Sequence, residues 1–437
     1  MNRIPQIVTF ATLCGMSAAA PAWGGGLYLY EIGSPDVGLA AAGYAARAQD
    51  ASTAFTNPAG MTRLEKSQVQ FGAQPLYMHL KFHPDSRTDF GPEVKVIKGP
   101  LSGDDGNASA WTPTAGTFIV TPLSPDLRFG FSIAGNFGAG LDYGDDWVGR
   151  YYLKDVLMQG LTLAPALAYR INKKFSVGAS LNAMYGILEE TVAVNNAAVL
   201  NPSFPDGEME IEDRTWGLGA TLGVLAEPQP GTRFGATYMT KIELEFEDKP
   251  QFSGLRPLLE AALDSRGLLN ATLELPLDVP QAVMVSAFHQ LNDRLAIMGN
   301  LGWQDWSEFG KVDVTVSAED TTSLTVDRNY KDTWHTALGL QYQLSDPWLL
   351  SGGIAYDSEM VDEEDLTPDL PSGASWRFGA GAQYAWSEKL KLNCAYELTW
   401  TGDLSMDVNR GPLTGRLAGE YESVALHVMV LGLNWNF

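Results

Sequence analysis

Regular alternation between large apolar residues and small or polar residues marks most of the chain after residue 67. The pattern is clearest at 175–187, 216–224, 234–246, 376–386 and 390–400. Successive side chains of a β-strand point to opposite faces of its sheet, so this two-residue period predicts amphipathic strands. The strands near 68–82 and 110–122 alternate less clearly, and their boundaries are less certain. The pattern therefore indicates an all-β fold.

Strand length and aromatic placement favour a membrane barrel over a soluble sandwich. The alternating segments run for about ten residues or more, which is long for a sandwich but fits tilted membrane strands. Trp and Tyr collect at their ends, as in the aromatic girdles of outer-membrane barrels. A soluble sandwich that buries its apolar face remains the alternative from the pattern alone.

Tight and long connections alternate along the chain. The short turns are expected at 124–126, 172–174, 227–232, 292–294, 345–347 and 387–389. Long polar loops are expected at 83–109, 138–157, 189–213, 247–271, 317–329, 358–373 and 402–421. Short turns at one rim and long loops at the other are typical of bacterial outer-membrane barrels, and the count of strands between them is roughly fourteen.

The two ends of the chain support export to the outer membrane. Residues 1–22 have the pattern of a secretory signal peptide, with Arg3 before an apolar core and a small-residue site at 20–22. No later run of about 18 apolar residues could form a membrane-spanning helix. The chain stops on an alternating segment that ends at Phe437. A final strand with an aromatic C-terminus resembles the signal read by the barrel-assembly machinery, which we expect as a partner.

Composition excludes several other functions. The formal net charge is −23, so no basic surface exists to bind nucleic acid. There is no G-x-S-x-G or G-x-x-x-x-G-K motif, which argues against an outer-membrane esterase and against a nucleotide cofactor. The five histidines have no metal-ligand spacing, and the acidic run at 357–365 lacks that of an EF-hand. We expect no catalytic residues, cofactor or metal.

The segment from Tyr30 to Met61 has small side chains and follows neither a helical nor a strand period. Such a segment can pack its backbone closely against other backbone, so we expect it to plug the barrel. Its residues resemble the hatch of the FadL family of outer-membrane transporters for hydrophobic compounds. The resemblance rests on Gly33, Gly38, Gly43, Asp50, Asn57, Pro58 and Ala59. It extends to segments such as Trp303 to Phe309 and Tyr330 to Trp334 and covers the mature chain.

The resemblance implies a signal peptide at 1–22, a hatch at 23–66 and a membrane-spanning antiparallel barrel at 67–437. It also implies uptake of long-chain fatty acids or other hydrophobic compounds, such as hydrocarbons, by passive diffusion. In the family, cargo leaves sideways into the membrane through a gap at a kinked third strand. Here the third strand reaches Gly135, Asn136, Phe137 and Gly138, and glycines within a strand often mark a bulge. A simple glycine-rich loop entrance is the alternative.

Two further regions are candidates for cargo binding. Leu258, Leu259 and Leu263 fall at helical spacing in a long loop, so 257–266 could form an amphipathic landing helix or could simply cover its own base. Lys331 is the candidate for a carboxylate head group, with an ion pair to Asp332 as the alternative. Arg150 and Arg377 are weaker candidates.

The membrane and the cargo define the remaining partners and alternatives. We expect contact with outer-membrane lipid and lipopolysaccharide. Acidic residues predicted to face inward, Glu243 and Glu245, would favour neutral hydrocarbons over fatty-acid anions. A general diffusion porin and a structural surface protein such as an adhesin remain the alternative functions.

Overall fold

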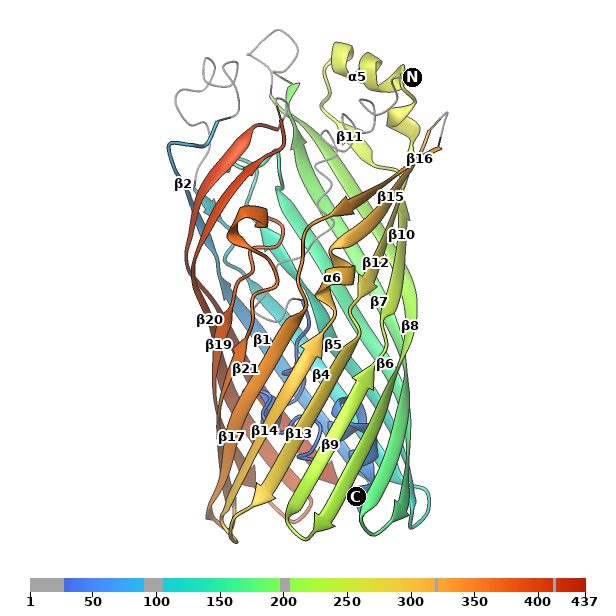
Figure 1. The fold of residues 1–437 in the computed structure, drawn as a ribbon, viewed down its shortest axis with the longest axis vertical. Coiled ribbons are helices and arrows are strands. Elements are labelled where there is room, and N and C mark those ends of the chain that lie inside the picture. Colours follow the sequence, from blue (N-terminus) through green and yellow to red (C-terminus); the bar gives the residue numbers. More distant parts are fainter. Residues whose placement is uncertain (1–26, 90–104, 197–204, 319–320, 412–413) are drawn as a thin grey trace.

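A computed structural model describes residues 27–89, 105–196, 205–318, 321–411 and 414–437. Within these residues, fourteen antiparallel strands form a closed barrel (Figure 1). The last strand pairs with the first, from Gln68 opposite Asn436 to His79 opposite Ala425, so the sheet closes on itself. The wall strands are β1 (Gln68–His79), β4 (Trp111–Pro122), β5 (Leu127–Asp142), β6 (Asp155–Asn172), β7 (Phe175–Val194), β8 (Gly207–Gln229), β9 (Thr232–Met239), β13 (Ala282–Gln290), β14 (Leu295–Gln304), β17 (Thr333–Ser345), β18 (Trp348–Asp357), β19 (Ser375–Ala385), β20 (Leu390–Asn409) and β21 (Arg416–Asn436).

The outer surface of the wall is apolar. Leu218 and Leu338 are each 66% exposed, whereas inward-facing Ser286 and Asn300 are buried. A soluble sandwich would show the opposite arrangement, because its apolar residues would fill the core. Aromatic pairs such as Tyr185–Trp216 and Trp348–Tyr384 lie on this outer surface, with ring centroids 5.0 and 4.8 Å apart. Among the residues described, no helix is long and apolar enough to cross a membrane.

Short turns lie at the rim near the C-terminus, as predicted, and longer segments extend beyond the opposite rim (Figure 1). Three of the predicted long loops, those at 189–213, 317–329 and 402–421, are largely wrong. Most of the described part of 317–329 is a strand that pairs with the strand before it. The β7–β8 ladder continues to Val194 opposite Gly207, and the β20–β21 ladder to Asn409 opposite Arg416. These polar stretches remain strands because their backbone groups pair with each other above the bilayer.

The prediction of a single strand at 234–246 is also wrong. The wall strand β9 ends at Met239, and the chain then forms β10 (Ile242–Asp248) in a separate sheet. In β10, Leu244 and Phe246 are buried while the glutamates are exposed. The apolar face turns inward here because water, rather than lipid, surrounds this part of the molecule. The other strands of this sheet are β12 (Thr272–Val279), β15 (Lys311–Ser317) and β16 (Thr321–Asp327).

Short elements complete the extracellular end. Two small strands, β2 and β3, extend the first hairpin, and β11 pairs with β8. The helix α5 covers the mouth region (Figure 1). These elements are β2 (Lys81–Pro84), β3 (Gly106–Asn107), β11 (Gln251–Ser253), α5 (Pro257–Asp264), η3 (Leu268–Asn270), α6 (Trp306–Phe309) and η4 (Glu363–Asp365).

Residues 27–66, which we call the hatch segment, lie inside the barrel near its short-turn end (blue in Figure 1). They contain only short elements: α2 (Ser34–Val37), α3 (Thr53–Thr56) and η1 (Pro58–Arg63). The expected signal peptide at 1–22 lies outside the described residues.

Candidate functional site

The hatch segment contacts the wall through glycines. A Cβ added at Gly353 would collide with the carbonyl of Leu39, and one at Gly235 would collide with the carbonyl of Ala45. Gly43 adopts a positive φ of 77° and donates its N–H to Asn300 Oδ1 at 3.0 Å. Backbone thus packs directly on backbone, as the small side chains of this segment predicted.

The remaining glycines of the predicted hatch motif lie at similarly close contacts. Gly38 packs against Gly381 of β19, where an added Cβ would lie 3.0 Å from the Gly381 Cα. Gly33 lies next to Asp36 and Gln70. A side chain at Gly38 would push the hatch segment away from the wall, whereas one at Gly33 would crowd Asp36 and Ser52 of the hatch segment and Gln70 of β1.

The Asn57-Pro58-Ala59 motif attaches the hatch segment to β8. Asn57 is buried, and its Nδ2 donates to the carbonyls of Ala45 at 2.6 Å and of Val224 at 3.0 Å. Its Oδ1 accepts from the N–H of Ala59, and Pro58 begins η1. The backbone of Asn57 is ordinary extended chain, with a φ of −155° and a ψ of 99°. The side chain, not the backbone conformation, makes this residue special.

Charged side chains hold the C-terminal end of the hatch segment and a turn within it. Arg128 and Arg170 of the wall donate to the carbonyls of Leu64 and Thr62, at the C-terminal end of η1. Cations at a helix C-terminus are favourable because the last carbonyls have no helical partner. Within the segment, Asp50 accepts from the N–H and the hydroxyl of Ser52.

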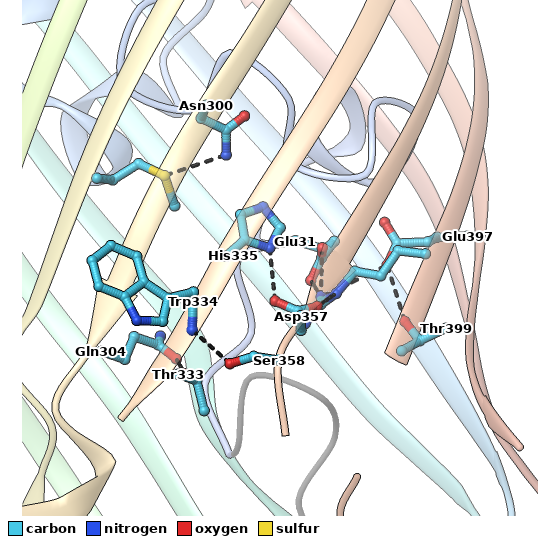
Figure 2. Close-up of polar contacts among 12 residues, drawn as sticks. Glu31, Asn300, Gln304, Thr333, Trp334, His335, Asp357, Ser358, Glu397 and Thr399 are labelled. Atoms are coloured by element: carbon cyan, nitrogen blue, oxygen red, sulfur yellow. Dashed lines mark hydrogen bonds and ion pairs between the residues drawn. The ribbon is translucent and has the colours of Figure 1, made fainter. Parts of the chain in front are cut away.

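A buried ionic cluster joins the start of the hatch segment to the wall (Figure 2). Arg377 Nη1 donates to both carboxylate oxygens of Glu31, at 2.7 and 2.8 Å, and Arg377 Nε donates to Asp357 at 2.5 Å. His335 Nδ1 lies 2.7 Å from the other oxygen of Asp357, and Glu397 lies 3.8 Å from Arg377. Three buried carboxylates therefore surround one buried guanidinium.

Sequence reasoning identified Arg377 only as a weak cargo candidate and missed its partners. The reason is distance along the chain, because Glu31 and Arg377 are separated by 346 residues. The available signal was Glu31 itself, an acidic residue in a segment made mostly of small, uncharged side chains. The structure shows that Arg377 is occupied by residues of the protein itself.

The predicted lateral opening lies at an interruption of the wall ladder. β4 and β5 pair only from Pro122 opposite Arg128 to Gly116 opposite Ala134. Beyond Ala134, β5 continues to pair with β6, and the register shifts at Asn136, which forms a bulge. The upper parts of β4 and β5 therefore share no backbone ladder.

The start of the hatch segment covers this interruption. Leu29 donates its N–H to the Asn136 carbonyl at 2.9 Å, and Gly138 donates to the Leu27 carbonyl at 2.9 Å. Between them, Tyr28 forms an isolated antiparallel bridge with Phe137. Gly138 has a φ of 105°, and a Cβ there would collide with the Met158 carbonyl, so this position requires glycine.

An apolar interior connects the extracellular end with the bulge. One hydrophobic cluster includes Leu263 of α5, Leu244 and Leu275 of the extracellular sheet, and Met158 and Phe137 next to the bulge. Phe137 also stacks with Trp306 of α6, at 6.5 Å between centroids and an interplanar angle of 11°. Apolar molecules can be held along such a surface without specific polar contacts.

The periplasmic end of the interior differs because polar side chains enter its lining. A cavity of about 300 Å³ lies against the hatch segment. Its lining combines apolar residues such as Leu64 and Leu349 with the polar residues Gln49, Asp50, Gln341, Gln383, Asn393 and Asn434. An apolar molecule that entered it would cover these polar groups without replacing their hydrogen bonds.

The outer candidate residues lie apart from the bulge. Leu259 and Leu263 of α5 are buried, whereas Leu258 is 64% exposed. Lys331 pairs with Glu359 and Asp362, not with Asp332 as suggested. The hydrogen bond to Asp362 raises the pKa of the Lys331 ammonium above its ordinary value, so Lys331 stays charged. Glu243 and Glu245 lie on the exposed face of β10, so the prediction that they line the interior is wrong.

Arg150 is also occupied within the protein, by Asp206 at 2.8 Å. Among the described side chains, no group of three or more His, Cys, Asp or Glu residues is arranged to hold a metal ion.

A closed barrel with an apolar outer surface and a plugged interior defines an outer-membrane transport barrel. Residues 15–437 match the family described as outer membrane protein transport protein (OMPP1/FadL/TodX). The chain belongs to this family, as the sequence resemblance predicted, and it is a transport protein of the Gram-negative outer membrane and not an enzyme.

Known relatives match nearly the whole chain. The long-chain fatty acid transport protein of Salmonella typhi is 24% identical over 434 residues, covering 95% of this chain and 94% of the relative. Outer membrane protein P1 of Haemophilus influenzae is 25% identical over 460 residues, covering 96% of each. A FadL homologue from Pseudomonas aeruginosa has a TM-score of 0.84 at 22% identity, covering 94% of this chain and 99% of the other. The toluene transporter TodX of Pseudomonas putida gives 0.69 at 15%, covering 93% and 98%.

Proposed function

We propose that this protein takes up long-chain fatty acids or other hydrophobic compounds by passive diffusion, with lateral exit into the outer membrane at the β5 bulge. The observation that carries the proposal is the interrupted β4–β5 ladder, which the start of the hatch segment covers. The names of the relatives, a long-chain fatty acid transport protein and a toluene transporter, support this class of cargo.

The contrast between the two ends of the interior supports a sideways route. The path from α5 to Phe137 is apolar, while the cavity at the hatch segment includes amides and charged groups among its apolar lining residues. Each buried CH₂ group of a cargo is worth about 0.8 kcal/mol, so an acyl chain would follow the apolar surface. Exit between β4 and β5 leads from that surface directly into hydrocarbon.

The candidate residues have distinct proposed roles. Exposed Leu258, on a helix held by buried Leu259 and Leu263, offers the first apolar contact outside. Lys331 attracts a carboxylate head group, in competition with Glu359 and Asp362. Gly135, Asn136, Phe137 and Gly138 form the lateral opening. The residues of the hatch motif, Gly33, Gly38, Gly43, Asp50, Asn57, Pro58 and Ala59, seat the hatch.

We further propose the division of the chain into a signal peptide at 1–22, a hatch at 23–66 and a barrel at 67–437. The exposed terminal ring of Phe437, next to Trp435, would be read by the barrel-assembly machinery. Lipopolysaccharide would surround the extracellular half. These partners follow from the location of the protein in the outer membrane.

Deleting Asn136 tests the lateral exit. The deletion should remove the bulge and let β5 pair regularly with β6, which closes the opening while the barrel still folds. We measure uptake of radiolabelled oleate and of toluene by cells that lack other transporters. Cells that express the Asn136 deletion should take up no more of either compound than cells without the gene. Deletion of Asp146, in the exposed loop after β5, controls for shortening of the chain.

Normal uptake by a correctly folded Asn136 deletion would contradict the lateral route. If the wild-type gene had no effect on uptake of any fatty acid or hydrocarbon, the transport function itself would be wrong. An adhesin predicts this second result, so the two failures can be told apart.

A further inference from the structure

The lipid-facing wall opposite the β5 bulge contains an apolar groove. It crosses β13, β14, β17 and β18 and has a volume of about 670 Å³, within the ~300–1,000 Å³ range of small-molecule sites. Gly299 and Gly352 form its floor, where the outward-facing positions lack side chains. Ile297, Leu338 and Leu340 rise beside them with exposed fractions of 44%, 66% and 48%. The groove is therefore a recess in the surface that faces hydrocarbon.

The groove lies in the half of the wall nearest the short turns. Ile297 pairs with Leu340 only two residues above the pair Leu295–Tyr342, with which the β14–β17 ladder begins. Short turns of bacterial barrels face the periplasm. The lipid next to the groove is consequently that of the periplasmic leaflet.

Both signs of charge lie at the turn end of the groove. His289 borders the groove, and its Nδ1 is 2.9 Å from Thr232 Oγ1. Arg294 is exposed in the turn below. Asp293 lies in the same turn, and Asp346 lies in the neighbouring turn, which is connected to it through Gln343. A head group that carries both a phosphate and an amine complements this set.

We propose that the groove is a binding site for one zwitterionic, amine-bearing phospholipid of the periplasmic leaflet. An acyl chain lies over Gly299 and Gly352, the phosphate contacts Arg294, and the amine contacts Asp293 and Asp346. The groove is continuous with the lipid-facing surface, so hydrocarbon reaches it without crossing water. Cationic groups near a membrane interface commonly bind lipid head groups.

The groove lies directly behind a contact between the wall and the hatch segment. Gly353, next to Gly352 but facing inward, contacts the Leu39 carbonyl of the hatch segment. Only the backbone of β18 separates the groove from the hatch segment at this point. A bound acyl chain would fill the recess and add contacts where the wall has no side chains of its own.

Native mass spectrometry of the full-length protein tests the site. The protein, purified in a mild detergent, is titrated with phosphatidylethanolamine or phosphatidylglycerol. We expect retention of one phosphatidylethanolamine, with phosphatidylglycerol bound more weakly. Gly352→Leu should fill the groove, because a Cβ there meets only the Gly379 carbonyl at 3.9 Å. Its lipid adduct should be about tenfold lower, as expected when an apolar site is occluded.

Two further variants keep the test decisive. Ala179→Leu adds the same bulk to an exposed wall position on β7, away from the groove, and should retain the lipid. Arg294→Gln leaves the barrel wall untouched and should weaken phosphatidylethanolamine binding. This variant provides the test if Gly352→Leu does not fold. The proposal would be overturned if Gly352→Leu and Arg294→Gln retained as much lipid as the wild type, or if the two lipids bound equally. A second protein copy bound in place of lipid would also overturn it.

Discussion

Single residues decide how the hatch segment is held, and the most consequential is Arg377. Its guanidinium is the shared partner of Glu31 and Asp357 and lies near Glu397, and all four side chains are buried. His335 Nε2 and Glu397 Oε2 have no hydrogen-bond partner in the described structure. Removing the arginine would leave the carboxylates uncompensated in a site from which water is excluded, which is far more costly than losing an exposed ion pair.

Replacing Arg377 with methionine should therefore destabilise the folded barrel by about 3–5 kcal/mol. The measurement is the temperature at which the unboiled gel band converts to the unfolded mobility, and it should fall clearly. Arg214→Met provides the control, because Arg214 pairs with Glu189 and Glu212 on the exposed surface, where a pair is worth about 0–1 kcal/mol. Equal shifts for the two variants would show that the buried cluster contributes no special stability.

Elements decide where cargo can meet the protein, and α5 is the element that presents apolar surface outside the membrane. Pro257 begins the helix, and its Leu259 and Leu263 are buried in the hydrophobic cluster that includes the extracellular sheet. Leu258 points away from this cluster, with most of its surface exposed. An exposed leucine on an otherwise well-anchored helix is a contact site that can be removed without unfolding the loop.

Leu258→Gln should lower uptake at limiting cargo concentration by roughly tenfold or more, since burying a leucine side chain is worth about 1.5–3 kcal/mol and about 1.4 kcal/mol is a tenfold change. Uptake at saturating cargo should change little, because the interior route is untouched. Glu260→Gln, which alters an exposed polar residue of the same helix, is the control. Loss of uptake at saturating cargo in Leu258→Gln would instead indicate a damaged extracellular sheet.

The whole molecule works as a barrel closed by a fitted plug, and that fit distinguishes it from an open porin. The wall supplies glycines at the places where the backbone of the hatch segment touches it, including Gly235, Gly353 and Gly379. The contacts are backbone to backbone, so neither partner can move closer or accept a side chain. Ion flow through the resting protein should consequently be small.

Gly353→Val should displace the hatch segment, because the new side chain collides with the Leu39 carbonyl. Conductance in a planar lipid bilayer should rise well above that of the wild type. The neighbouring variant Gly352→Val faces the lipid, where an added Cβ has open space, and should leave conductance unchanged. A large, steady conductance in the wild type would support a diffusion porin and contradict a seated plug.

Much of the fold could be predicted from the sequence because its main signal is local. The two-residue alternation at 175–187 and 216–224 identifies β7 and β8. It also identifies the face that meets lipid, because every second side chain of a barrel strand faces lipid and is apolar. The same signal failed at 234–246. There the alternation continues, but the surroundings of the strand change from lipid to water, and a pattern of residues carries no information about that boundary.

Part of the candidate site could likewise be predicted from the sequence, and part could not. The bulge region at 135–138 and the small-residue segment at 30–61 were recognisable because glycine content is visible in a sequence. The ionic cluster was not, since Glu31, Asp357, Arg377 and Glu397 come from the hatch segment and three separate strands. No spacing rule relates residues that meet only across a closed barrel.

The sequence by itself determined the class of protein, the faces of most wall strands and the segment that enters the barrel, because these follow from neighbours along the chain. The tertiary structure decided where the β4–β5 ladder stops, which wall glycines the hatch segment touches and which charges Arg377 neutralises. Each of these depends on closure of the wall between β1 and β21. Closure fixes the register of every strand, and register determines which distant residues face one another.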